Sequence, residues 1–215
     1  MDGKKLLRLS IFGLPVILAA AFLVCFCLPK EPAYQGRTLT DWIVNHPVGD
    51  QYWQDTGYAI QHIGTNAFPI LLKWVSARDS KPKARIISWL NAHPWLRVRI
   101  RPAYEWQQFA SVSFHFLGEA AKPVWPELVQ RTYDRDSSCR YTALLCLAES
   151  QADRETVLPV FRRLLKDPDQ QVQLAAAREL IGFYPEDAKA LHAYEMTPEW
   201  RFKNFKSDMD GRPMH

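Results

Sequence analysis

The sequence predicts an all-α fold: a short α-solenoid of helical hairpins that follows an N-terminal transmembrane helix. Two observations support this prediction, a long uncharged apolar run near the N-terminus and a helix–glycine–proline pattern that recurs along the chain. The chain has 215 residues, of which 47% are hydrophobic and 23% charged. A chain of this length and composition is expected to form one globular domain with an appendage.

The apolar run covers residues 9–29, none of which is charged. A helix of this length measures about 30 Å, the thickness of the hydrocarbon core of a bilayer. A cleaved signal peptide is the main alternative, with Ala19-Ala20-Ala21 as its only small-residue site. Signal peptides usually carry a shorter apolar run of about 7–15 residues, however. We therefore predict an uncleaved signal anchor; a buried core helix is the remaining alternative.

The flanking charges predict the orientation of this segment. Lys4, Lys5 and Arg8 precede it, against a single acidic residue, Asp2. By the positive-inside rule, residues 1–8 should lie in the cytoplasm and the domain outside it. The expected localisation is therefore a single-pass membrane protein, with a secreted protein after signal cleavage as the alternative.

The rest of the chain divides by composition. We expect a linker at residues 30–37, a helical domain at 38–196 with an insertion at about 77–104, and a poorly ordered tail at 197–215. Pro32 and Gly36 oppose regular structure in the linker. The domain should open on a capped helical turn, with Thr38 or Thr40 as the capping residue.

A repeated pattern defines the hairpins. Residues 59–69 match residues 113–123, and both read small–apolar–x–x–apolar–Gly–x–x–Ala–x–Pro. The glycine suits the left-handed position that ends a first helix, and the proline suits the first turn of a second helix. The alanine allows the two helices to approach closely.

Two weaker copies of this pattern follow, at residues 141–165 and 172–188. Their anchor positions continue from Gly118 to Ala148 and Gly182, close to the period of about 34 residues that helix–turn–helix repeats show. A unit of this period is typical of an α-solenoid, in which each hairpin packs against its neighbours. The alternative is an ordinary helical bundle whose turns coincide.

Two segments resemble HEAT repeats. One is residues 63–69, and the other is residues 164–177, which resemble the turn between repeats, with Gln173 where arginine is usual. An anchor followed by residues 34–42 and then by such repeats resembles membrane-anchored HEAT-repeat proteins of Verrucomicrobia-like bacteria. The resemblance covers about residues 30–195. It implies a curved helical scaffold that binds other macromolecules, and it implies almost nothing about a specific function.

The basic residues of the chain are concentrated in the insertion. Eight basic residues and one acidic residue lie between Lys73 and Arg101, so this stretch carries a net charge of +7 in a chain of net charge +4. An extended conformation from Arg97 onward would place alternate arginines on one face, with Val98 and Ile100 toward the domain. The candidate partner-binding patch comprises Lys81, Lys83, Arg85, Trp95, Arg97, Arg99 and Arg101. A solvated loop is the alternative interpretation.

No catalytic, cofactor-binding or metal-binding motif is recognisable in the sequence. The six histidines show no metal-ligand spacing, and nine glycines form no phosphate-binding loop. The four cysteines predict free thiols rather than a disulfide framework. We therefore expect a non-enzymatic scaffold or adaptor without a cofactor, whose unknown protein partner is acidic at the contact; nucleic acid is a less favoured partner. An enzyme on a HEAT-like scaffold and a lipid-surface or envelope structural protein are the alternatives.

Overall fold

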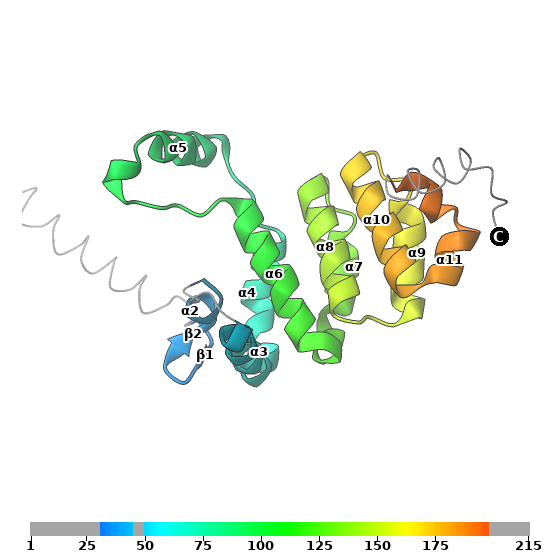
Figure 1. Cartoon of the computed structure of the whole chain (residues 1–215), viewed down its shortest axis with the longest axis horizontal. Coiled ribbons are helices and arrows are strands. Elements are labelled where there is room, and N and C mark those ends of the chain that lie inside the picture. The colour runs from blue at the N-terminus through cyan, green and yellow to red at the C-terminus, as the bar shows by residue number, and fades with distance from the viewer. Residues whose placement is uncertain (1–30, 45–49, 198–215) are drawn as a thin grey trace, which may run out of the picture. The chain divides into compact units, whose positions relative to one another are not determined.

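The computed structural model describes residues 31–44 and 50–197 (Figure 1). The predicted transmembrane segment at residues 9–29, the segment before it and the tail after Thr197 lie outside the described residues. Within the described part, no helix has both the length and the apolar character that crossing a membrane requires.

The elements are β1 (Ala33–Tyr34), β2 (Arg37–Thr38), α2 (Leu39–Val44), α3 (Asp50–Ile63), η1 (Gly64–Ala67), α4 (Phe68–Val75), α5 (Lys81–Ala92), η2 (Pro94–Leu96), α6 (Ala103–Leu117), η3 (Gly118–Val124), α7 (Trp125–Arg131), α8 (Ser137–Glu149), α9 (Arg154–Leu164), α10 (Gln170–Phe183), α11 (Pro185–Ala190) and η4 (Ala193–Met196).

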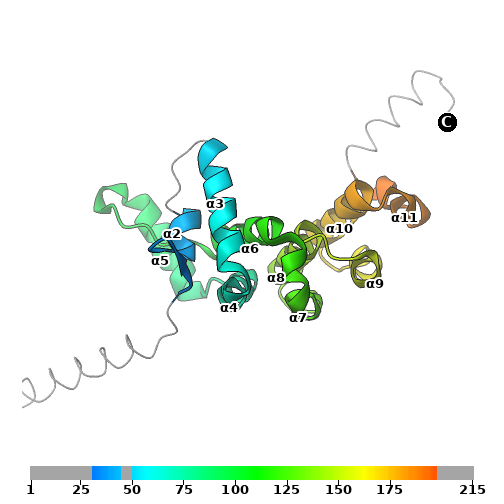
Figure 2. The ribbon, with the colours of Figure 1, turned by 90° about the horizontal axis from the view of Figure 1, so that it is seen from below.

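Most of these helices form hairpins that pack side by side (Figures 1 and 2). The first helices of successive hairpins are neighbours: α3 contacts α6, α6 contacts α8, and α8 contacts α10. The second helix of each hairpin packs against the first helix of the next, so that α4 lies against α6, α7 against α8 and α9 against α10. The prediction of an all-α domain built from helical hairpins is therefore confirmed.

The first repeat found in the sequence corresponds to equivalent positions in two hairpins. Gly64 and Gly118 follow the last residues of α3 and α6, with φ of 56° and 51°. Glycine reaches this left-handed region without the steric cost that a side chain brings. Ala67 and Ala121 are both fully buried in the turns that follow. The local pattern of the sequence therefore predicted both helix ends correctly.

The later anchor positions differ from the prediction. Gly182 lies inside α10 instead of ending it, and Ala148 lies inside α8. In the third hairpin the left-handed residue is Gln151, with φ of 54°. Pro69 occupies the first turn of α4 as predicted, whereas in the second hairpin the corresponding place at the start of α7 belongs to Pro126.

A second repeat relates the turn before α8 to the turn before α10. Asp136 and Asp169 cap these helices, each accepting a hydrogen bond from the backbone N–H two residues later, at 3.0 and 2.8 Å. Asp134 and Asp167, two residues earlier, accept from the backbone N–H of these capping residues at 2.8 and 2.9 Å. The two turns therefore have the same construction, because each aspartate satisfies a donor that the helix start leaves unpaired.

One continuous core holds the hairpins together. Its fully buried side chains include Ile60 in α3, Phe114 in α6, Leu144 in α8, and Phe161 in α9. Two cysteines, Cys139 and Cys146, are also buried there as free thiols. Close packing between α3 and α6 depends on Gly57. A Cβ atom at this position would lie 2.7 Å from the Phe116 ring, so a larger residue would displace that ring or the helix that carries it.

The predicted linker contains a small hairpin instead of irregular chain. β1 and β2 pair antiparallel, and Gln35 and Gly36 form the turn with positive φ. Thr38 then caps α2, because its hydroxyl accepts a hydrogen bond from the Asp41 N–H at 3.1 Å. The Trp42 indole N–H donates to the carbonyl oxygen of Tyr34 at 3.0 Å and fixes the hairpin to this helix.

Candidate functional site

The predicted basic patch lies in the segment that links α4 to α6, but it is only partly available for a partner. Lys83 is bound to Asp79 at 2.6 Å, while Arg99 and Arg101 both bind Glu105 at 2.9 and 2.7 Å. Burial alone would raise the pKa of Glu105, but the hydrogen bonds from the two arginines outweigh it and lower that pKa. The charges of these three cations are therefore partly compensated within the chain, although the Arg99 side chain is still 70% exposed.

The extended arrangement predicted from Arg97 onward is wrong. Arg97 has a left-handed backbone, with φ of 52°, which interrupts the strict alternation of faces. Val98 is 58% exposed and Ile100 is 38% exposed, so neither side chain is buried against the domain. Trp95, the aromatic member of the patch, is 73% exposed. Lys81 and Arg85 lie on α5, no residue of which is buried.

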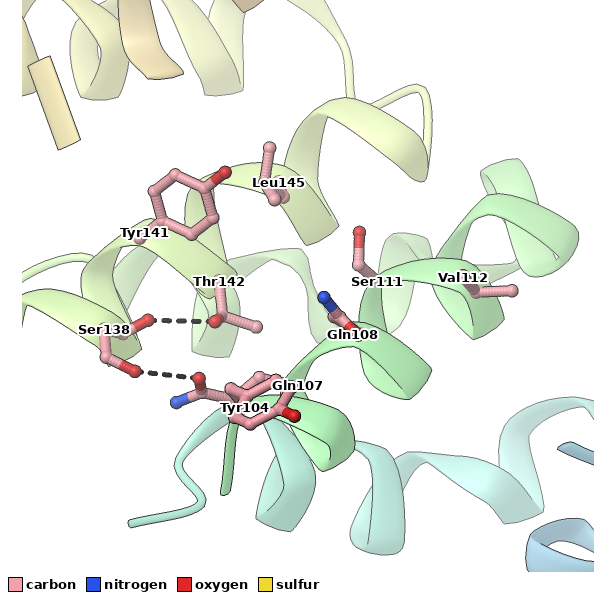
Figure 3. Close-up of a pocket in the computed structure, with 9 residues that line it drawn as sticks. All are labelled: Tyr104, Gln107, Gln108, Ser111, Val112, Ser138, Tyr141, Thr142 and Leu145. Carbon is pink, nitrogen blue, oxygen red and sulfur yellow. Dashed lines mark hydrogen bonds between the residues drawn. The ribbon is translucent and has the colours of Figure 1, made fainter. Parts of the chain in front are cut away.

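A groove that the sequence analysis missed lies between α6 and α8 (Figure 3). Its volume is about 520 Å³, and no charged residue lines it. Two exposed tyrosines contribute to it, Tyr104 from α6 and Tyr141 from α8. The other lining residues are Gln107, Gln108, Ser111, Val112, Ser138, Thr142 and Leu145.

Hydrogen bonds hold the floor of this groove. Gln107 is buried and donates its amide N–H to the carbonyl oxygen of Ala77 at 3.0 Å. Its amide oxygen accepts from the Ser138 hydroxyl at 2.8 Å, which ties α6 to α8 (Figure 3). Gln108 and Ser111, by contrast, make no side-chain hydrogen bond to any described residue. Gln108 is exposed and Ser111 is partly exposed, so their amide and hydroxyl groups can pair with the backbone of a bound peptide.

A second hollow of about 320 Å³ continues this groove along α6, because Ser111 and Val112 line both. Trp53 from α3 stacks on Phe116 at a centroid distance of 6.2 Å and forms one wall. On the opposite side, His115 lies 2.8 Å from the Glu149 carboxylate. The combined surface therefore crosses three first helices, α3, α6 and α8, and presents aromatic rings beside hydrogen-bonding groups.

The sequence contained a signal for this groove. Tyr104, Gln108, Ser111 and His115 recur along α6 at intervals of three or four residues, so they lie on one helix face. Ala110 and Ser113, which lie on the other side of α6, are fully buried. The neighbouring wall could not be identified in the same way, because it depends on how α8 packs against α6.

An ionisable residue on α10, Glu179, interacts electrostatically with Glu149, which lines the second hollow. Burial, and secondarily the charge of Glu149, raises the pKa of Glu179 to about 7. The folded state then binds the proton more tightly than the unfolded chain, so stability falls as pH rises from about 4.5 to 7. Glu179→Gln should therefore raise the free energy of unfolding at pH 8 by about 1–3 kcal/mol, with little change at pH 4.5. Urea titrations at both pH values test this, with Glu155→Gln on the exposed surface as the control; an equal effect at both pH values would contradict it.

No motif for a metal or cofactor was predicted. Within the described ranges, no three His, Cys, Asp or Glu side chains are grouped as a metal site requires. Burial raises the pKa of both cysteine thiols, Cys139 and Cys146. Thiols with a raised pKa are poor nucleophiles at neutral pH.

Comparison with known families identifies one part of the chain. Residues 125–193 match the family model for HEAT repeats. The match extends from α7 through α11 and supports the HEAT-repeat family that the sequence resembles. The match includes the turn before α10, where Gln173 replaces the usual arginine. In the preceding turn, before α8, the equivalent position is occupied by an arginine, Arg140. No curated protein and no solved structure matches the chain.

Proposed function

We propose that this protein is a membrane-tethered, non-enzymatic scaffold that binds a protein partner along the groove of α6 and α8. HEAT repeats commonly mediate protein interactions, and the match at residues 125–193 includes α8, one wall of the groove. We infer that the hairpins form a short α-solenoid. In this arrangement, the first helices present a continuous surface to the partner.

The groove itself is the observation that carries the proposal. Tyr104 and Tyr141 are 58% and 38% exposed on its two walls. Tyrosine is favoured at protein interfaces because it offers a large rigid surface together with a hydroxyl group. Between the two rings, Gln108 and Ser111 offer hydrogen-bonding groups that no described residue uses. This combination suits an extended peptide segment of a partner better than a small charged metabolite.

The tether rests on the sequence. We propose that residues 9–29 span the membrane once, with residues 1–8 in the cytoplasm and the domain on the other side. This arrangement is also the one suggested by the resemblance to membrane-anchored HEAT-repeat proteins. The partner would then be a protein at the same membrane or in the compartment that it borders. The groove has no charged lining, so the expectation that the partner is acidic at the contact stays a prediction.

Cross-linked co-purification from native membranes tests the groove. We expect the wild-type chain to recover a specific protein, and Tyr104→Ser/Tyr141→Ser to recover it at least tenfold less well, because the two aromatic walls are lost. Tyr58→Ser is the matched control, since Tyr58 is 61% exposed on α3 but lines neither hollow. If the groove variant recovered the partner as well as the control and the wild type do, the groove would be excluded as the binding surface. Circular dichroism checks that each variant is folded.

A further inference from the structure

The segment between α4 and α6 does not form a hydrophobic core. We call residues 81–100 the basic arm; it comprises α5, η2 and the following loop. No residue of the arm is buried, and Figure 1 shows α5 well separated from α6 and the helices after it. Five of the eleven large hydrophobic side chains that are exposed in the described chain lie within this arm: Ile86, Trp89, Trp95, Val98 and Ile100.

The arm is also positively charged and largely uncompensated. No acidic residue lies between Asp79 and Glu105. Lys81, Arg85 and Arg97 form no ion pair with any described residue. Exposed tryptophans and unpaired cations therefore occur together on a segment that does not stabilise the core.

The geometry of α5 brings the two kinds of side chain onto one side. Lys81, Arg85 and Trp89 follow one another at intervals of four residues and so share a helix face. Trp89 packs against His93, with ring centroids 4.6 Å apart, and Trp95 meets the same histidine edge to face at 6.3 Å. The aromatic groups thus form one cluster at the end of the helix, next to the charged stripe.

We propose that the basic arm binds the headgroup region of an anionic membrane surface. Indole rings favour the interface between headgroups and hydrocarbon, because one edge is apolar and the N–H is polar. Each Lys or Arg near an anionic leaflet contributes about 1 kcal/mol of attraction. A helix that combines both is typical of interfacial membrane binding. An acidic protein would satisfy the charges but would leave most of the exposed tryptophan surface without a matching environment.

This inference adds a second membrane contact to the proposed tether, and the two are separable. A tether at residues 9–29 holds the chain on any bilayer, whereas the arm requires anionic lipid and is weakened by salt. The arm would orient the domain on the surface and leave the groove between α6 and α8 open to its partner.

Hydrogen–deuterium exchange of the full chain in lipid nanodiscs tests the arm. In discs of phosphatidylcholine with about 30% phosphatidylglycerol, we expect amides of residues 81–100 to exchange at least fivefold more slowly than in phosphatidylcholine alone. The protection should disappear at 0.5 M NaCl, where the screening length falls to a few ångströms. It should also disappear in Lys81→Glu/Arg85→Glu/Arg97→Glu, which alters only exposed side chains.

A charge-matched control separates the arm from general electrostatics. Arg162→Glu/Lys166→Glu/Lys189→Glu changes three exposed cations elsewhere in the domain and should keep the protection. Exchange that is equal in the two lipids would overturn the proposal, as would protection of the arm by polyglutamate but not by anionic lipid. A chain that joins neither type of disc would count against the tether alone. Sedimentation with preformed anionic vesicles then tests the arm, and failure to sediment would refute it.

Discussion

Replacing Asp167 with alanine should lower the free energy of unfolding by about 3–5 kcal/mol. The Asp167 carboxylate receives two hydrogen bonds from the Arg140 guanidinium, at 2.6 and 2.8 Å. The two side chains are only 3% and 10% exposed. Without the carboxylate, the guanidinium would stay in a buried site with its charge uncompensated, which costs far more than the net stabilisation of the pair.

Arg140 cannot easily leave this site, because it also donates to the carbonyl oxygens of Asp134 and Arg135, at 2.9 and 3.1 Å. Urea denaturation measures the loss. The matched control is Asp187→Ala, which removes a pair of the same geometry whose arginine, Arg154, is 60% exposed. Asp187→Ala should lower the free energy of unfolding by only a small fraction of the loss in Asp167→Ala, because water can solvate the arginine that remains. Similar losses in the two variants would mean that burial of the Arg140 pair contributes nothing.

The sequence predicted those parts of the fold that depend on local patterns. Gly64 and Gly118 marked two helix ends, because the backbone conformation that ends a helix favours one residue type there. The match of Asp134 with Asp167, and of Asp136 with Asp169, was equally local and was overlooked. The prediction at Gly182 failed, because a glycine within an apolar pattern is tolerated inside a helix when packing continues it.

The surface was harder to predict, because it depends on contacts between distant segments. The groove requires α6 and α8 to lie together, as the hydrogen bond between Gln107 and Ser138 shows. The total charge of the insertion was predicted correctly, but Glu105 pairs with Arg99 and Arg101 and compensates part of that charge. A count of charges along the chain does not reveal which of them the fold neutralises.

Phe114→Ala should destabilise the whole domain, again by about 3–5 kcal/mol. Phe114 is fully buried in α6, the helix that contacts α3, α4 and α8. Removing its ring would leave a cavity at the point where the N-terminal hairpin meets the later hairpins. Phe183→Ala, at the exposed end of α10, should change stability by no more than about 0.5 kcal/mol.

The distribution of tryptophans makes this variant informative about cooperativity. Seven of the eight tryptophans lie between Trp42 and Trp125, so fluorescence reports mainly on the N-terminal half, whereas circular dichroism reports on all helices. If neighbouring hairpins stabilise one another through α6, both signals should shift together to lower urea in Phe114→Ala. If the fluorescence transition moved alone, the later hairpins would fold independently of the N-terminal hairpin. The groove that spans α6 and α8 would then lose the rigid support that its proposed partner needs.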